Sequence, residues 1–255
     1  MPIQYWELSD ALCKKADSFL NTVNLLDWYQ NYHWSADTKN SNFQDIVSLE
    51  IELIQAAKQN AIRCSHVRKI ALWGAHPMLD KIQCHDPFDL PIYEGGAPAS
   101  WIKTDPAKGI RIIRPQVKYV GPTYSSKILR FSMPHEFGAL DTRITRVFGR
   151  GDPDHAYLPF LEIEAEPIGI KWFIKNPQPA WPDEYSTFIF ILRYMAYKLN
   201  ESGIKCPHPP LLYDHKLREP GIWECADVEM ALFSFASARI YPSSTQGKNG
   251  EKRIS

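Results

Sequence analysis

The chain has 255 residues and no net charge, with 44% hydrophobic and 23% charged residues. This is the composition of a soluble globular protein, long enough for one large domain or for two lobes that share a core. No stretch reaches the length of a membrane span and no secretory signal opens the chain, so we expect a cytoplasmic protein with no membrane contact. The five cysteines are scattered, and an odd number argues against a disulfide framework.

The first third of the chain is predicted to be helical. Apolar residues recur at helical spacing from Tyr5 to Trp34, from Phe43 to Arg63 and from Val67 to Trp73. The stretch from His76 to Pro115 is rich in Pro, Gly and Asp, and we expect loops and short turns there.

The most informative stretch runs from Val117 to Gly149. Gly121 and Pro122 predict a tight turn followed by a helix, because proline suits the first helical position, where its missing N–H has no partner to lose. Asp141 stands just ahead of apolar residues at helical spacing, which predicts a second helix with an aspartate at its start.

The remainder adds one departure from the helical pattern. Residues 160–175 alternate polar and apolar side chains, which predicts a β-hairpin-like insertion of two short strands joined near Pro167. A long helix is predicted from Pro182 to Asn200, a final helix from about Asp227, and a flexible tail over 242–255. We therefore expect a mainly α fold of two helical lobes over residues 1–241.

Two motifs in this stretch resemble those of the helix-hairpin-helix DNA glycosylases. Residues 117–125 (VKYVGPTYS) match a hairpin of the form LPGVGxxTA, and residues 139–147 (ALDTRITRV) match the aspartate motif VDTHVxRV. The interval of 20 residues from Gly121 to Asp141 is also the usual one in that family. The resemblance covers residues 117–149 and implies a helix-hairpin-helix motif there.

Three positions depart from the family pattern. Tyr119 replaces the first hairpin glycine, so positive φ is not freely available there. Arg143 replaces the histidine of the aspartate motif. Thr123 aligns with the lysine that bifunctional members use to form an imine with the sugar. Without an amine at that position the resemblance implies a monofunctional enzyme that uses water and leaves an abasic site.

Asp141 has two compatible roles. As a helix cap it would contribute roughly 1 kcal/mol of stability. The resemblance makes it also the catalytic carboxylate, which would stabilise an oxocarbenium-like transition state and orient the attacking water.

The charge distribution favours DNA as the partner despite the neutral total. Residues 101–150 hold ten Lys or Arg and three acids, a net charge of +7 against −7 elsewhere. The alternative is a solvated helical surface balanced by acidic neighbours. The DNA-binding residues that we predict are Lys118, Tyr119, Gly121, Thr123, Lys127, Arg143 and Arg146.

We expect no cofactor. Only Cys206 and Cys225 follow the aspartate motif, so the four-cysteine iron–sulfur cluster of some relatives is not expected. His135 and His208 lack partners at metal-ligand spacing, which predicts no metal site. We expect a monomer.

The leading hypothesis is a monofunctional DNA glycosylase that removes a damaged or modified base flipped out of the duplex. The divergent hairpin and the inserted strands leave open a role in antiviral defence against modified phage DNA as well as a role in repair. Two further hypotheses are a non-catalytic helix-hairpin-helix DNA-binding protein and a helical scaffold that binds no DNA.

Overall fold

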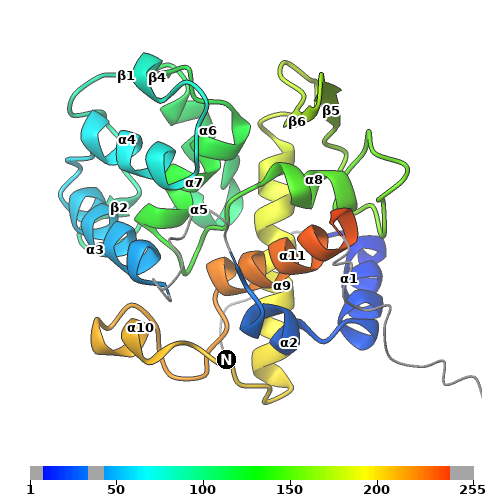
Figure 1. Cartoon of the computed structure of the whole chain (residues 1–255). Helices are drawn as coiled ribbons and strands as arrows, with labels where there is room; N and C mark the ends of the chain where they lie inside the picture. Colours follow the sequence, from blue (N-terminus) through cyan, green and yellow to red (C-terminus); the bar gives the residue numbers. More distant parts are fainter. Residues whose placement is uncertain (1–7, 34–42, 242–255) are drawn as a thin grey trace, which may run out of the picture.

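The computed structural model describes residues 8–33 and 43–241 and has the mainly α fold that the sequence predicts (Figure 1). The helices form two groups with the connection from α7 to α8 passing between them. The first lobe holds α3 (Gln44–Lys58), α4 (Cys64–Trp73), α5 (Trp101–Thr104), α6 (Ala107–Ile113) and α7 (Pro122–Ser132). The second lobe holds α1 (Asp10–Thr22), α2 (Leu25–Gln30), α8 (Thr142–Phe148), α9 (Glu184–Glu201) and α11 (Cys225–Ile240).

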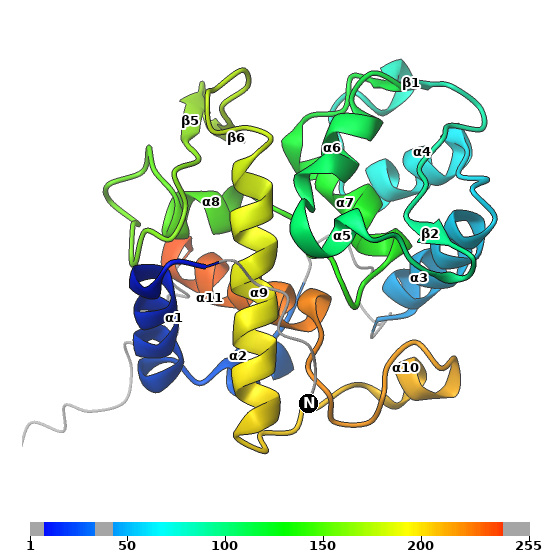
Figure 2. The same ribbon diagram turned by 180° about the vertical axis from the view of Figure 1, so that it is seen from behind.

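Short strands supplement the helices. In the first lobe β1 (Gln83–Cys84) pairs with β4 (Val117–Lys118), and β2 (Tyr93–Glu94) pairs with β3 (Ala97–Pro98), both antiparallel. A 3₁₀ turn, η1 (Leu79–Lys81), precedes β1, and α10 (Pro210–Asp214) lies on the connection from α9 to α11. Seen from behind in Figure 2, α9 runs the length of the second lobe with α1 packed beside it.

The first predicted helix is divided in the structure. Asn24 begins α2 by accepting a hydrogen bond from the Leu26 N–H at 3.2 Å, while Val23 is extended. An asparagine that caps a new helix ends the previous one, so the single helix predicted from Tyr5 to Trp34 was wrong at this point. Residues 5–7 and 34 of that prediction, like the predicted tail over 242–255, lie outside the described residues.

The loops expected between His76 and Pro115 contain a helix that matters for the site. α6 packs against α7, and Gly109 allows the close approach, since a Cβ there would lie 2.8 Å from Leu129 Cδ2. Ile110 and Ile113 of α6 are fully buried. The turn at residues 119–121 is therefore flanked by two packed helices, which is a helix-hairpin-helix arrangement.

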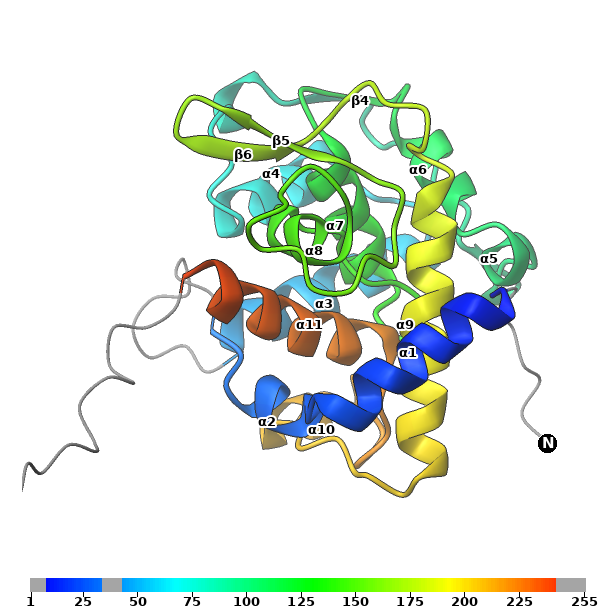
Figure 3. The ribbon, with the colours of Figure 1, turned by 90° about the vertical axis from the view of Figure 1, so that its right-hand side faces the viewer.

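The predicted β insertion is present as β5 (Ala165–Ile168) and β6 (Lys171–Ile174), an antiparallel pair. The strands are joined at Gly169 and Ile170 rather than near Pro167, which instead pairs with Trp172 inside the hairpin. Gly169 has φ +62°, a conformation that favours glycine at the first position of a two-residue hairpin turn. Figure 3 shows this hairpin projecting from the second lobe beyond α8.

A buried ionic network connects the two lobes. Glu50 on α3 is fully buried and accepts hydrogen bonds from Arg130 at 2.7 Å and from Arg218 at 2.9 and 3.0 Å. Arg218 also donates to Asp227 on α11 at 3.1 Å, and Arg130 Nε lies 3.8 Å from Glu229 on the same helix. Glu50, Arg130, Arg218 and Asp227 each have an oppositely charged neighbour, which offsets part of the cost of burying their charges.

Among the described residues, no helix combines the length and the apolar character that crossing a bilayer requires.

Candidate functional site

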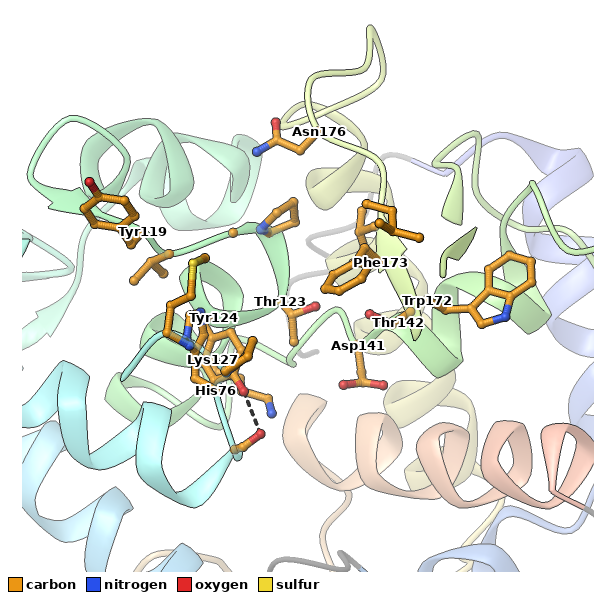
Figure 4. A pocket seen from close by; sticks show the side chains of 18 of the residues that line it. His76, Tyr119, Thr123, Tyr124, Lys127, Asp141, Thr142, Trp172, Phe173 and Asn176 are labelled. Carbon is orange, nitrogen blue, oxygen red and sulfur yellow. Dashed lines mark hydrogen bonds between the residues drawn. The ribbon is translucent and has the colours of Figure 1, made fainter. Parts of the chain in front are cut away.

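A cavity of about 630 Å³ lies between the two lobes (Figure 4). Its walls come from the loop after α4, the hairpin turn with the start of α7, the residues that begin α8, and the β5–β6 hairpin. Five residues predicted from the sequence line this one cavity: Tyr119, Gly121, Thr123, Lys127 and Asp141.

Asp141 both caps α8 and faces the cavity. Its Oδ1 accepts a hydrogen bond from the Arg143 N–H at 2.8 Å, which confirms the predicted cap. The residue is 9% exposed, and its carboxylate points into the space between the two walls in Figure 4. The cap engages Oδ1, and the Asp141 carboxylate still lines the cavity.

Ser126 ties the aspartate to the hairpin. Its hydroxyl donates to the Thr123 carbonyl at 2.9 Å and accepts from the Leu140 N–H at 2.9 Å. Ser126 is fully buried, so water cannot replace either bond. The residue before Asp141 is thus fixed to the first turn of α7, and the 20-residue interval in the sequence becomes a rigid connection.

Lys127 places an amine in the cavity one helical turn after Thr123. The side chain is buried, with Nζ 4.8 Å from the centre of the Trp73 ring and 5.0 Å from that of Tyr124. Burial lowers the pKa of Lys127 and the nearby Asp141 carboxylate opposes that shift. From the sequence, an amine was sought only at the aligned position 123, and Lys127 was predicted to bind DNA. The structure gives this lysine a place at the cavity beside Asp141.

The wall beside Lys127 is aromatic. The Tyr124 hydroxyl donates to the Gly74 carbonyl at 2.5 Å, and its ring lies edge-on to His76 with centroids 4.3 Å apart. Burial raises the pKa of Tyr124, and burial together with Lys127 lowers the pKa of His76. Near neutral pH this wall therefore presents an uncharged phenol and an uncharged imidazole.

The hairpin turn differs from its prediction in backbone conformation. Tyr119 has φ +64°, the left-handed region that the replacement of glycine was expected to restrict, and it is 50% exposed. Gly121 has φ −82°, and a Cβ at this position would meet nothing within 4 Å. Its backbone therefore faces open space at the cavity wall. Lys118, on β4, is exposed beside Tyr119 but does not line the cavity.

Two of the predicted DNA-binding residues have partners inside the protein. Arg146 is buried, with Nε 2.5 Å from Asp152 and its guanidinium 4.3 Å from the centre of the Trp172 ring. Arg143 donates to the Ser237 hydroxyl at 3.0 Å and lies over the Phe233 ring. Neither lines the cavity. Their sequence spacing gave no sign of this, because the partners belong to other elements.

A second, small chamber of about 20 Å³ lies behind Asp141 and Lys127. Glu229 contributes a carboxyl group, and burial raises its pKa to about 7. Tyr32 and Phe233 supply aromatic walls. Nothing in the local sequence marks Glu229, which lies 88 residues from Asp141 and is brought there by α11.

His208, predicted to lack partners at metal-ligand spacing, lies beside a cysteine and a carboxylate. Its Nε2 lies 3.0 Å from Asp227 Oδ2, and ligand atoms of Cys206, His208 and Asp227 fall within 4.8 Å of one another. The same carboxylate accepts from Arg218 at 3.1 Å and from the Glu224 N–H at 3.0 Å. The guanidinium already neutralises Asp227 and would repel a cation, so we assign this cluster to the buried ionic network.

Comparison of the chain with protein-family models, with curated proteins and with solved structures finds no significant match. The resemblance to helix-hairpin-helix glycosylases rests on the motif residues and on their arrangement.

Proposed function

We propose that the protein is a DNA glycosylase that hydrolyses the bond between a flipped base and its sugar and leaves an abasic site. The observation that carries the proposal is that the Asp141 carboxylate and the turn at Gly121 face one cavity between the lobes. A glycosylase needs a group that binds the DNA backbone and, close to it, a group that stabilises charge on the sugar. The two must be close because the flipped nucleotide remains attached to the bound strand.

The group that binds the DNA backbone would come from α7. Pro122 is its first residue and has no N–H, so the amides of Thr123 and Tyr124 are the first donors at the positive end of an 11-residue helix. A phosphate bound there would be supported by the exposed Lys118 on the adjoining strand. The open backbone at Gly121 would let the phosphate approach closely.

Asp141 would carry the chemistry. As the bond from C1′ to the base breaks, positive charge develops on the sugar, and a carboxylate in a partly desolvated cavity stabilises it more strongly than in water. The departing base keeps the electron pair of the broken bond and takes up a proton from solvent. Water bonds to C1′ and gives up a proton, for which Asp141 is a suitable acceptor. The loss of this group should reduce the rate by about 10²–10⁴-fold.

The test is base release from a panel of DNAs that includes damaged duplexes and genomic DNA of phages with modified bases. Asp141→Asn is the matched variant, since asparagine also caps helices and retains the acceptor for the Arg143 N–H. Strand cleavage that requires alkali and occurs only with the unaltered protein would support the proposal. DNA binding by both proteins without any base release would favour the non-catalytic DNA-binding alternative.

Lys127 makes a second outcome informative. Lys127 lies beside Asp141 and brings an amine into the cavity, where it could act as the nucleophile in place of water. Strand cleavage without alkali, together with borohydride trapping of a protein–DNA adduct that Lys127→Met abolishes, would show that the amine attacks the sugar in place of water.

A further inference from the structure

Exposed apolar side chains stand on both sides of the cavity mouth. On the β5–β6 hairpin Ile168 is 60% exposed, Ile170 98% and Phe173 37%. On the opposite wall Tyr119 is 50% and Met78 42% exposed. All except Ile170 line the cavity, and Ile170 is at the turn of the same hairpin. We call these five residues the apolar rim. Isolated exposed apolar residues are common, but a group around one opening indicates a contact surface.

Contacts with the second lobe hold the β5–β6 hairpin, and with it three residues of the apolar rim, in place. Trp172 lies under the Arg146 guanidinium at 4.3 Å, and the Gln178 side chain accepts from the Glu164 N–H at 2.8 Å and donates to the Lys175 carbonyl at 2.6 Å. The strand ends Ala165 and Ile174 are buried. The turn is thus the free end of an anchored two-stranded arm, which Figure 3 shows extending from the second lobe.

A cation adjoins an apolar residue on each side of the mouth. Lys118 precedes Tyr119 on the first lobe, Lys171 follows Ile170 on the hairpin, and both lysines are exposed. Phosphates of a nucleic acid strand can contact the lysines while its flat apolar bases contact the neighbouring side chains. A purely apolar partner would gain nothing from either lysine.

We propose that the turn of the β5–β6 hairpin enters duplex DNA next to the target nucleotide, with Ile170 between base pairs and Tyr119 against the base exposed on the other side. This inference rests on the proposed function and names the form of DNA that the site takes, a stacked duplex in which a base must be displaced. An apolar wedge fills the gap left by the displaced base and prevents its return. Single-stranded DNA has no stack to open and does not need the wedge.

The experiment uses the full chain carrying Asp141→Asn, so that no turnover occurs. The probe is a duplex with a tetrahydrofuran abasic-site analogue and 2-aminopurine as the neighbouring base, compared with the same strand unpaired. We expect 2-aminopurine fluorescence to rise on duplex binding as the base unstacks. Ile170→Ser should weaken duplex binding about tenfold and remove most of that rise, because burial of a fully exposed isoleucine side chain is worth about this factor in affinity. Binding to the unpaired strand should change less than about twofold.

Ile222→Ser is the matched control, since Ile222 is 46% exposed and lies outside the cavity lining. It should leave both affinities unchanged. Duplex affinity and fluorescence that do not change with Ile170→Ser would overturn the inference and leave the proposed function standing. Failure of the parent protein to bind either DNA would overturn both. Sedimentation as a dimer that Ile170→Ser converts to a monomer would assign the rim to a second copy of the chain and overturn the inference.

Discussion

Arg218→Met tests whether the buried ionic network sets the stability of the two-lobed structure. Arg218 donates two hydrogen bonds to Glu50 and one to Asp227, and both carboxylates are fully buried. Methionine preserves much of the side-chain volume but leaves each carboxylate with one cation fewer. Removing one partner of a buried pair costs about 3–5 kcal/mol of unfolding free energy. For a chain of 255 residues this corresponds to a fall in melting temperature of about 6–20 °C.

Urea denaturation and thermal melts followed by circular dichroism would measure the loss. Lys69→Met is the control, because the Lys69–Glu52 pair is exposed, with side chains 54% and 40% accessible. Exposed pairs contribute about 0–1 kcal/mol, so this variant should melt close to the unaltered protein. An Arg218→Met cost no larger than that of Lys69→Met would refute the reasoning, since it would mean that the buried carboxylates adjust without their cation.

Three further predictions concern the site. Gly121→Ala should leave the melting temperature unchanged within about 2 °C, because a Cβ there meets nothing within 4 Å. The same variant should weaken DNA binding in a fluorescence-polarisation titration, and equal affinity would contradict the proposed phosphate site. Ser126→Ala should cost about 1–3 kcal/mol of unfolding free energy in urea, because the buried Leu140 N–H loses its acceptor; a smaller loss would show that the loop before Asp141 adjusts. Burial raises the pKa of Glu229 to about 7, so the stability from its protonated form is fully present below about pH 4.5 and is lost as pH rises through 7. Glu229→Gln should therefore reduce the fall in unfolding free energy between pH 5 and 8, and an unchanged pH profile would contradict the assignment.

The sequence predicted the elements whose signals are local. The turn at Gly121, the helix beginning at Pro122, the cap at Asp141 and the strands within 160–175 all depend on a few neighbouring residues, and the structure contains each of them. α6 was missed because its seven residues follow a stretch of prolines and glycines that predicts loops, while its packing against α7 at Gly109 cannot be read from the local sequence.

The residues around Asp141 could be predicted only in part, since their contacts join distant parts of the chain. Arg146 has the sequence context of a phosphate contact, but its partners are Asp152 beyond a loop and Trp172 on the inserted hairpin. Lys127 lies one helical turn after Thr123, so both residues are on the same face of α7 and Lys127 lies beside the Asp141 carboxylate. An alignment that compares motif positions one by one does not show this. Glu229 reaches the site through the course of α11 alone.

Tyr119 holds a backbone conformation that lowers the stability of the folded chain. A non-glycine residue held at φ +64° costs about 1–2 kcal/mol, and Tyr119 is 50% exposed. Glycine, which the resembled motif has at this position, would adopt the same backbone without strain. Folding stability alone would therefore favour glycine at this position. Tyrosine instead places an exposed aromatic side chain at the edge of the cavity, at a cost in the free energy of folding.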